Sequence, residues 1–198
     1  MRSSLNRIGA WCMLVLVVAQ LLLIFGSWLI TAAMPDDFTH SLLSPEGIRW
    51  FFGRFVENLN TPFLVWLLLI SIAVGAFVRS GILRFDRQSY RQRTAMRFVV
   101  IEAFLFLAVM LTLTLTPHAI LLNVMGGLMA SSFTKSIVPY TSFAVLVMSI
   151  SYGLMSDRLK SLEDVYGAAS YGIRMLAPLY LLYILFVQLS SSIAYLFL

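Results

Sequence analysis

Glu102 is the only ionisable side chain that lies well inside a long apolar stretch of this sequence. A carboxyl group within a membrane span is a candidate for binding a proton or a cation, because its burial is costly. It follows Arg97 by five residues, roughly 7–8 Å along a helix that rises 1.5 Å per residue, so its carboxylate could also pair with an arginine outside the span. We favour this structural ion pair, whereas an unpaired Glu102 would favour proton or sodium coupling.

A second set of polar candidates lies in the last apolar stretch. Gln188 and the serines at 190–192 give it a polar stripe, and Pro178 frees a backbone carbonyl in the same segment. Such residues either form hydrogen bonds between helices of a bundle or dimer, or they line a substrate path. Asn123, in an apolar segment between two spans, joins Glu102 and Gln188 as a candidate substrate-binding or ion-binding residue.

Residue patterns typical of enzymes are not recognisable in the sequence. His40 and His118 have no partners at metal-ligand spacing, and no catalytic triad or glycine-rich phosphate loop occurs. Cys12 is the single cysteine, which excludes an intrachain disulfide and a cysteine-based metal cluster. The sequence therefore predicts neither an enzyme nor a cofactor nor a metal site.

The composition is that of a membrane protein. Of 198 residues, 60% are hydrophobic and 12% charged, and the mean hydropathy is +0.90, outside the range of soluble proteins. Apolar runs that cross a bilayer as single segments must be helices, because the hydrocarbon offers the backbone no partners. We predict an all-α polytopic helix bundle, a single membrane domain over residues 1–198, with five spans at about 8–34, 63–82, 98–116, 137–155 and 175–198.

Lysines and arginines are distributed unequally between the segments that flank these spans. Of the 14, eleven lie on one side and only Arg49, Arg54 and Lys135 lie on the other. Because positive residues are retained in the cytoplasm, the N-terminus is predicted to be cytoplasmic and the C-terminus to lie at the opposite face.

The most basic segment, residues 79–97, carries six arginines against one acid, Asp86. Nucleic-acid binding could account for these charges, but contact with anionic lipid headgroups accounts for them without a further partner. We therefore predict no nucleic-acid partner, with the lipid bilayer itself as the partner of this segment. The arginines expected to contact headgroups are Arg84, Arg87, Arg91 and Arg93.

Three connecting segments have recognisable patterns. Residues 119–133 are too short and too polar for a span and are predicted to form a re-entrant or interfacial piece on the outer side. Ser-Pro-Glu at 44–46 supplies an N-cap, a first-turn proline and an acid. Apolar residues then fall on one helix face through Leu59, which predicts a single interfacial amphipathic helix; they are Ile48, Phe51, Phe52, Phe55 and Leu59. Ser161 and Asp164 resemble a capping box at the start of a helix that leads into the fifth span.

Two blocks of sequence carry a likeness to a known family. The first is Leu-Leu-Ser-Pro-Glu-Gly-Ile-Arg-Trp at 42–50, followed by Asn58 and by Ser-Gly-Ile at 80–82. The second opens with Ser-Ile-Val-Pro at 136–139 and continues with Tyr152-Gly153, Lys160-Ser161, Asp164-Val165, Ala177-Pro178 and Gln188. Together they resemble the p-aminobenzoyl-glutamate transporter (AbgT) family.

This resemblance implies a bacterial inner-membrane protein that works as a dimer with inverted repeats, holds its substrate in helical hairpins and is driven by protons or cations. The family's Ser-Asn hairpin signature and its C-terminal repeat are missing from this sequence. We therefore expect transport of a small molecule, such as an aromatic carboxylate or a drug, by a homo-oligomer or together with another membrane subunit.

The alternative is a scaffold or accessory subunit that does not itself transport. Such a protein would use the Phe-rich amphipathic helix and faces of small residues to anchor a larger membrane complex, because small side chains let helices approach closely. Gly75 with Ala76, and Ala168 with Ala169, are the candidate faces.

Overall fold

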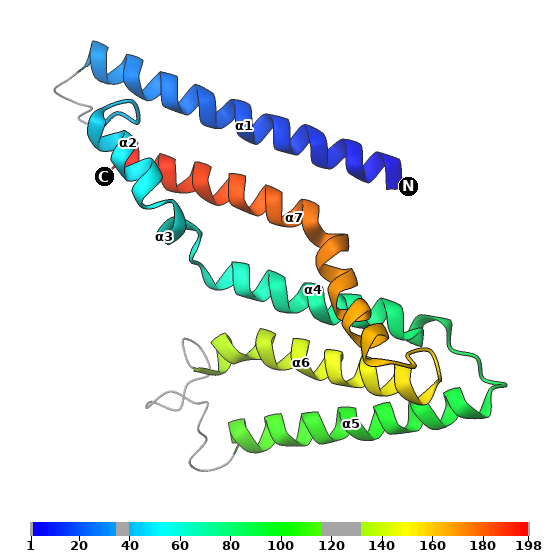
Figure 1. Cartoon of the computed structure of the whole chain (residues 1–198). Coiled ribbons are helices and arrows are strands. Elements are labelled where there is room, and N and C mark those ends of the chain that lie inside the picture. Colours follow the sequence, from blue (N-terminus) through cyan, green and yellow to red (C-terminus); the bar gives the residue numbers. More distant parts are fainter. Residues whose placement is uncertain (1, 35–39, 116–131, 198) are drawn as a thin grey trace. The chain divides into compact units, whose positions relative to one another are not determined.

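The computed structural model describes residues 2–34, 40–115 and 132–197. In these ranges the regular structure is entirely helical (Figure 1), which confirms the predicted all-α class. The elements are α1 (Arg2–Ala33), α2 (Pro45–Gly53), α3 (Phe55–Leu59), α4 (Pro62–Ser80), the short 3-10 helix η1 (Ile82–Arg84), α5 (Tyr90–Leu115), α6 (Ser132–Met155) and α7 (Leu162–Leu196).

The five predicted spans are confirmed as helices: α1, α4, α5, α6 and α7 are each long and apolar enough to cross a bilayer. The N-terminal ends of two of these helices lie before the predicted starts of the spans. Helix α5 begins at Tyr90, before the predicted span start at residue 98. Helix α7 begins at Leu162, before the span start at residue 175 and where the capping pattern predicted the helix that leads into the fifth span. Hydropathy marks only the part of a helix that lies in hydrocarbon, so polar helical turns that precede the membrane escape it. The interfacial segment predicted at 119–133 lies almost wholly outside the described residues.

The chain divides into two compact units, which are described separately. Unit 1 comprises residues 1–64 and 177–198, and unit 2 comprises residues 65–176. The boundaries therefore fall inside α4 and inside α7, the latter next to Pro178. The single membrane domain expected from the sequence stays a prediction.

In unit 2, α5 and α6 pack side by side (Figure 1). Ala95 of α5 and Tyr152 of α6 are fully buried. Farther along the pair, the Tyr140 hydroxyl donates a hydrogen bond of 2.6 Å to the backbone oxygen of Phe106, and the two rings meet edge to face at 5.9 Å. These contacts determine which face of α5 packs against α6.

The remaining part of unit 2 depends on a backbone contact between α4 and α7. A Cβ atom added to Gly172 would collide with the backbone of Ser71 and Gly75, and one added to Gly75 would collide with the backbone of Gly172. Ala76 and Ala168 are buried at the same crossing. The small residues expected to anchor a larger complex are therefore packed largely against each other inside the chain, which corrects that part of the scaffold interpretation.

Unit 1 is built from α1, the α2–α3 segment and the C-terminal part of α7. The backbone N–H of Leu42 donates to the Ser27 hydroxyl at 3.1 Å, which ties the connecting segment to α1. Trp50 of α2 stacks on Tyr195 of α7 with ring centroids 4.4 Å apart. The Tyr183 hydroxyl donates to the Leu59 backbone oxygen at 3.1 Å.

The predicted amphipathic helix begins where expected, since the Ser44 side chain accepts a hydrogen bond from the Gly47 N–H at 3.0 Å. It was expected to be a single helix through Leu59, and this is wrong. Helix α2 ends at Gly53 and α3 starts at Phe55, with Arg54 between them at φ −99° and ψ 8°. Gly53 at the end of α2 has a low helix propensity, so ending the helix there costs little free energy.

The capping pattern at the start of α7 is confirmed. The Asp164 N–H donates to the Ser161 hydroxyl at 3.2 Å, and the Asp164 carboxylate accepts from the N–H groups of Ser161 and Lys160 at 3.2 and 2.9 Å. An aspartate thus takes the place that glutamate or glutamine usually holds in this motif. The helix then continues without interruption to Leu196.

Replacing Gly172 with alanine should destabilise the protein by about 1–3 kcal/mol, because the new methyl group has no space against the α4 backbone. Thermal unfolding in mild detergent, followed by circular dichroism, measures the change. Gly167→Ala in the same helix is the control: nothing lies within 4 Å of a Cβ there, so stability should stay the same or rise by up to about 1 kcal/mol. Equal losses in both variants would contradict the contact.

Candidate functional site

The described spans contain two polar sites, one in each unit. In unit 2 the Ser151 hydroxyl of α6 donates a hydrogen bond of 2.6 Å to Oε1 of Glu102 on α5. The other carboxylate oxygen, Oε2, is buried and has no hydrogen-bond partner among the described residues. A carboxylate with one oxygen held and the other open is suited to receive a proton or a small cation.

The ion pair that we favoured for Glu102 is not formed in the described part of the chain, whose three ion pairs do not include it. The reason is helix geometry. At 3.6 residues per turn, residues five apart point about 140° away from each other. Glu102 therefore faces α6, and Arg97 lies on a different side of α5.

The polar site of unit 1 joins α1 to α7. The Ser192 hydroxyl donates to the backbone oxygen of Gln188 at 2.8 Å and accepts from the Gln20 side-chain amide at 3.1 Å. Gln188 is only 5% exposed, and neither its Oε1 nor its Nε2 has a hydrogen-bond partner within the described residues. Oε1 of Gln20 is likewise buried and unpartnered there.

Gln20 was missed by the sequence analysis. The signal that singled out Gln188, a long polar side chain within an apolar run, applies equally to Gln20. Gln20 lies near the middle of the candidate span Asn6–Ala33. Gln20 thus carries the cluster of Gln20, Gln188 and Ser192, here called the glutamine cluster, into an apolar stretch where an unpaired amide is costly.

A cavity of about 490 Å³ lies beside this cluster in unit 1, between α1 and α7. It begins at Ala19 and Leu189, each adjacent in sequence to a glutamine, and extends along α1 to Thr31, roughly 18 Å at 1.5 Å per residue. Its volume lies within the ~300–1,000 Å³ range of small-molecule sites. The lining residues are Ala19, Leu22, Leu23, Gly26, Ser27, Ile30, Thr31, His40, Leu189, Ile193, Leu196 and Phe197.

Most of the cavity wall is apolar, and its polar residues, Ser27, Thr31 and His40, gather toward one end. At that end an aromatic group surrounds Tyr195, whose ring meets His40 edge to face at 5.5 Å and stacks on Trp50. A ligand with an aromatic or aliphatic body would thus find apolar contacts along the helices and polar groups at one end of the cavity.

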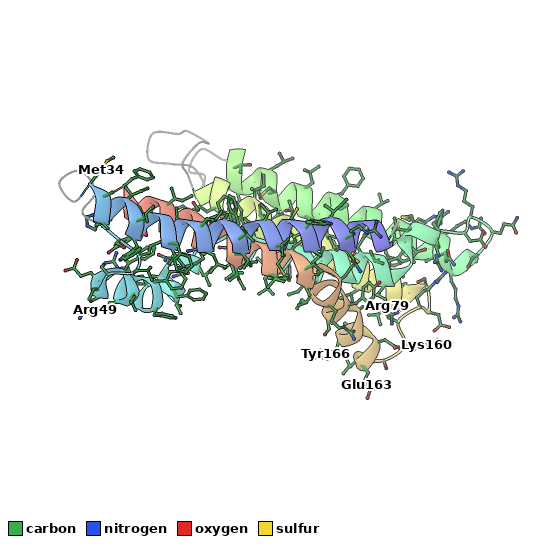
Figure 2. All side chains as sticks on the ribbon, turned by 90° about the horizontal axis from the view of Figure 1, so that it is seen from above. Met34, Arg49, Arg79, Lys160, Glu163 and Tyr166 are labelled. Atoms are coloured by element: carbon green, nitrogen blue, oxygen red, sulfur yellow. The ribbon has the colours of Figure 1, made fainter. Side chains whose placement is uncertain are left out.

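The basic segment lies at one end of unit 2. Figure 2 shows nitrogen-tipped side chains gathered toward the end where Arg79 and Lys160 lie. Of the four arginines predicted to contact headgroups, Arg91 forms an ion pair of 3.0 Å with Asp157. The other three, Arg84, Arg87 and Arg93, are exposed and belong to no ion pair among the described residues.

The structure thus places Glu102 and Gln188 at polar sites of different units, and Asn123 lies outside the described residues. The Glu102 site offers a carboxylate and the glutamine cluster offers amide and hydroxyl groups. Such groups can bind a cation or a small polar molecule. No family model, curated protein or solved structure matches this chain.

Removing the Ser151 hydroxyl should destabilise the protein by about 1–3 kcal/mol, because Glu102 then keeps a buried carboxylate without the hydrogen bond that holds it. The same Ser151→Ala change should cost little in a protein that already carries Glu102→Leu. A double-mutant cycle of unfolding free energies in detergent isolates this coupling. Purely additive losses would show that the two side chains do not interact.

Gln188→Leu should raise the unfolding free energy by about 1–3 kcal/mol, because it removes two buried polar atoms that have no partner and keeps a similar volume. Gln88→Leu in the exposed basic segment is the matched control and should change stability by less than about 0.5 kcal/mol. Thermal unfolding in detergent measures both. A loss of stability in Gln188→Leu would mean that the amide is paired in the folded protein.

Proposed function

We propose that this chain is a multi-pass protein of a bacterial inner membrane, related to AbgT-type transporters, that acts in small-molecule transport. The observation that carries the proposal is the Gln188 amide, 5% exposed and without a hydrogen-bond partner among the described residues. A buried amide without a hydrogen-bond partner costs free energy, and this cost is removed when the amide binds a polar group of a substrate.

The adjoining cavity indicates the kind of substrate. A wall of Leu, Ile and Phe side chains favours an apolar or aromatic body, and the Ser27, Thr31 and His40 side chains toward one end favour a carboxylate, amide or hydroxyl on that body. An aromatic carboxylate or a drug of similar shape combines both features. The substrate class expected from the sequence therefore suits the site.

Glu102 is the proposed coupling group. Its buried Oε2 atom has no hydrogen-bond partner among the described residues and is the proposed acceptor of a proton or sodium ion, while Ser151 holds Oε1 at 2.6 Å. Charge neutralisation at such a carboxyl changes the energy of a span by several kcal/mol, enough to bias one conformation over another.

Transport by an oligomer, or with another subunit, is supported by the outer surfaces of two helices. In α1 and α5 the most apolar 18-residue windows contain no buried residue. These faces can contact lipid or a neighbouring protein. The same observation favours the second candidate function, an accessory subunit that does not itself transport but presents α1 or α5 to a larger complex.

Flux through reconstituted protein tests the proposal. Proteoliposomes with an imposed proton or sodium gradient should accumulate p-aminobenzoyl-glutamate or another aromatic carboxylate. Gly26→Phe should abolish uptake, because Gly26 lines the cavity and a Cβ atom added there meets no atom within 4 Å, so the phenyl ring can enter the cavity without a clash at its base. Gly9→Phe is the matched control on the same helix, since it also has open space but does not line the cavity.

Glu102→Gln should remove the response to the gradient while Ser151 can still donate to the amide oxygen. Uptake that survives Gly26→Phe would contradict the proposed cavity. Wild-type protein without flux that purifies in a fixed ratio with another membrane protein would favour the accessory subunit.

A further inference from the structure

A hollow of about 510 Å³ lies on the outward face of α5, away from the Glu102 site. Two arginines one helical turn apart, Arg93 and Arg97, line it together with apolar side chains. The apolar lining residues are Phe85, Met96, Val100 and Ile101. Cationic and hydrocarbon surfaces thus meet in one depression where α5 enters its apolar span.

Hydrogen bonds to the Gln92 side chain position the segment that forms one wall of this hollow. The backbone N–H of Asp86 donates to Oε1 of Gln92 at 2.7 Å, and the Tyr152 hydroxyl reaches the same oxygen at 3.3 Å. These bonds fold the segment that follows η1 back onto the first turn of α5. Phe85 is thereby placed beside Arg93 as one wall of the hollow.

The charges of the hollow are available for an anion. Arg93 and Arg97 are exposed, and neither belongs to an ion pair within the part of the chain that the structure describes. Their neighbour Arg91 points to the other side of α5, where Asp157 neutralises it at 3.0 Å. The unneutralised positive charge on this helix is therefore concentrated at the hollow.

Hydrocarbon surface continues from the hollow along α5. Val100 is 46% exposed, Ile101 61% and Phe104 67%. These residues follow the arginines by one to three turns in the direction of the span. A molecule that fits the whole surface has an anionic head at the arginines and a chain along the helix.

We propose that this hollow is a binding site for one anionic phospholipid of the surrounding bilayer. Its phosphate lies between the guanidinium groups of Arg93 and Arg97, each of which can donate several hydrogen bonds to phosphate oxygens. One acyl chain lies against Val100, Ile101 and Phe104. The site is independent of the proposed transport, and it replaces diffuse headgroup contact by the basic segment with a defined lipid position.

Lipid binding to the full-length protein in detergent, followed by native mass spectrometry, tests the site. Phosphatidylglycerol should bind with one molecule per chain, and phosphatidylcholine should bind much more weakly. The double substitution Arg93→Gln/Arg97→Gln should weaken phosphatidylglycerol binding by roughly 10- to 30-fold. Arg84→Gln/Arg87→Gln removes the same charge from exposed positions outside the hollow and should weaken it less than about threefold.

Three results would overturn the proposal. Equal losses in the two double variants would mean that the whole segment attracts lipid without a defined site. Equal binding of both phospholipids to the wild type would mean that the arginines do not select the head. An unchanged affinity in Arg93→Gln/Arg97→Gln would place the lipid elsewhere, and thermal unfolding in lipid-free detergent checks that this variant is folded.

Discussion

A hydrocarbon solvent gives a buried polar side chain no partner except the protein itself, and this constraint sorts the polar residues of the spans into two groups. Many short hydroxyl side chains bond to the backbone of their own helix: Thr114 donates to the Met110 backbone oxygen at 2.7 Å and Ser149 to that of Val145 at 2.6 Å. Ser151 instead donates to Glu102 on the neighbouring helix. The longer side chains of Gln20, Gln188 and Glu102 keep polar atoms that no described residue satisfies. The first group maintains the fold, and the second marks where binding is to be expected.

The close approach of α4 and α7 decides which surfaces remain for partners. The Gly75–Gly172 contact brings two backbones together and buries small residues around it within the chain. What is left outside on α1 and α5 is large and apolar, with the arginine-lined hollow as an exception. A partner that recognises this chain therefore meets bulky side chains, and the attraction comes from their dispersion contacts and not from close backbone packing.

Much of the fold could be predicted from the sequence because hydropathy and capping are local signals. The five spans and the caps at Ser44 and Ser161 were found in this way. The break at Arg54 was missed because a helical wheel assumes an unbroken helix. The partner of Glu102 depends on which face of α5 meets α6, a tertiary property that distance along one helix cannot give.

The Ser192 hydroxyl imposes a direction on the glutamine cluster. The hydroxyl has one proton, which it donates to the backbone carbonyl oxygen of Gln188. It can therefore only accept a hydrogen bond from the side chain of Gln20. Gln20 must then turn its NH₂ group toward Ser192 and its oxygen away, whereas the Gln188 amide keeps both a donor and an acceptor. In the site that we propose, a guest carboxylate would therefore accept hydrogen bonds from Gln188 on α7, because the Gln20 oxygen can only accept, whereas a guest hydroxyl or ammonium group could donate to either helix.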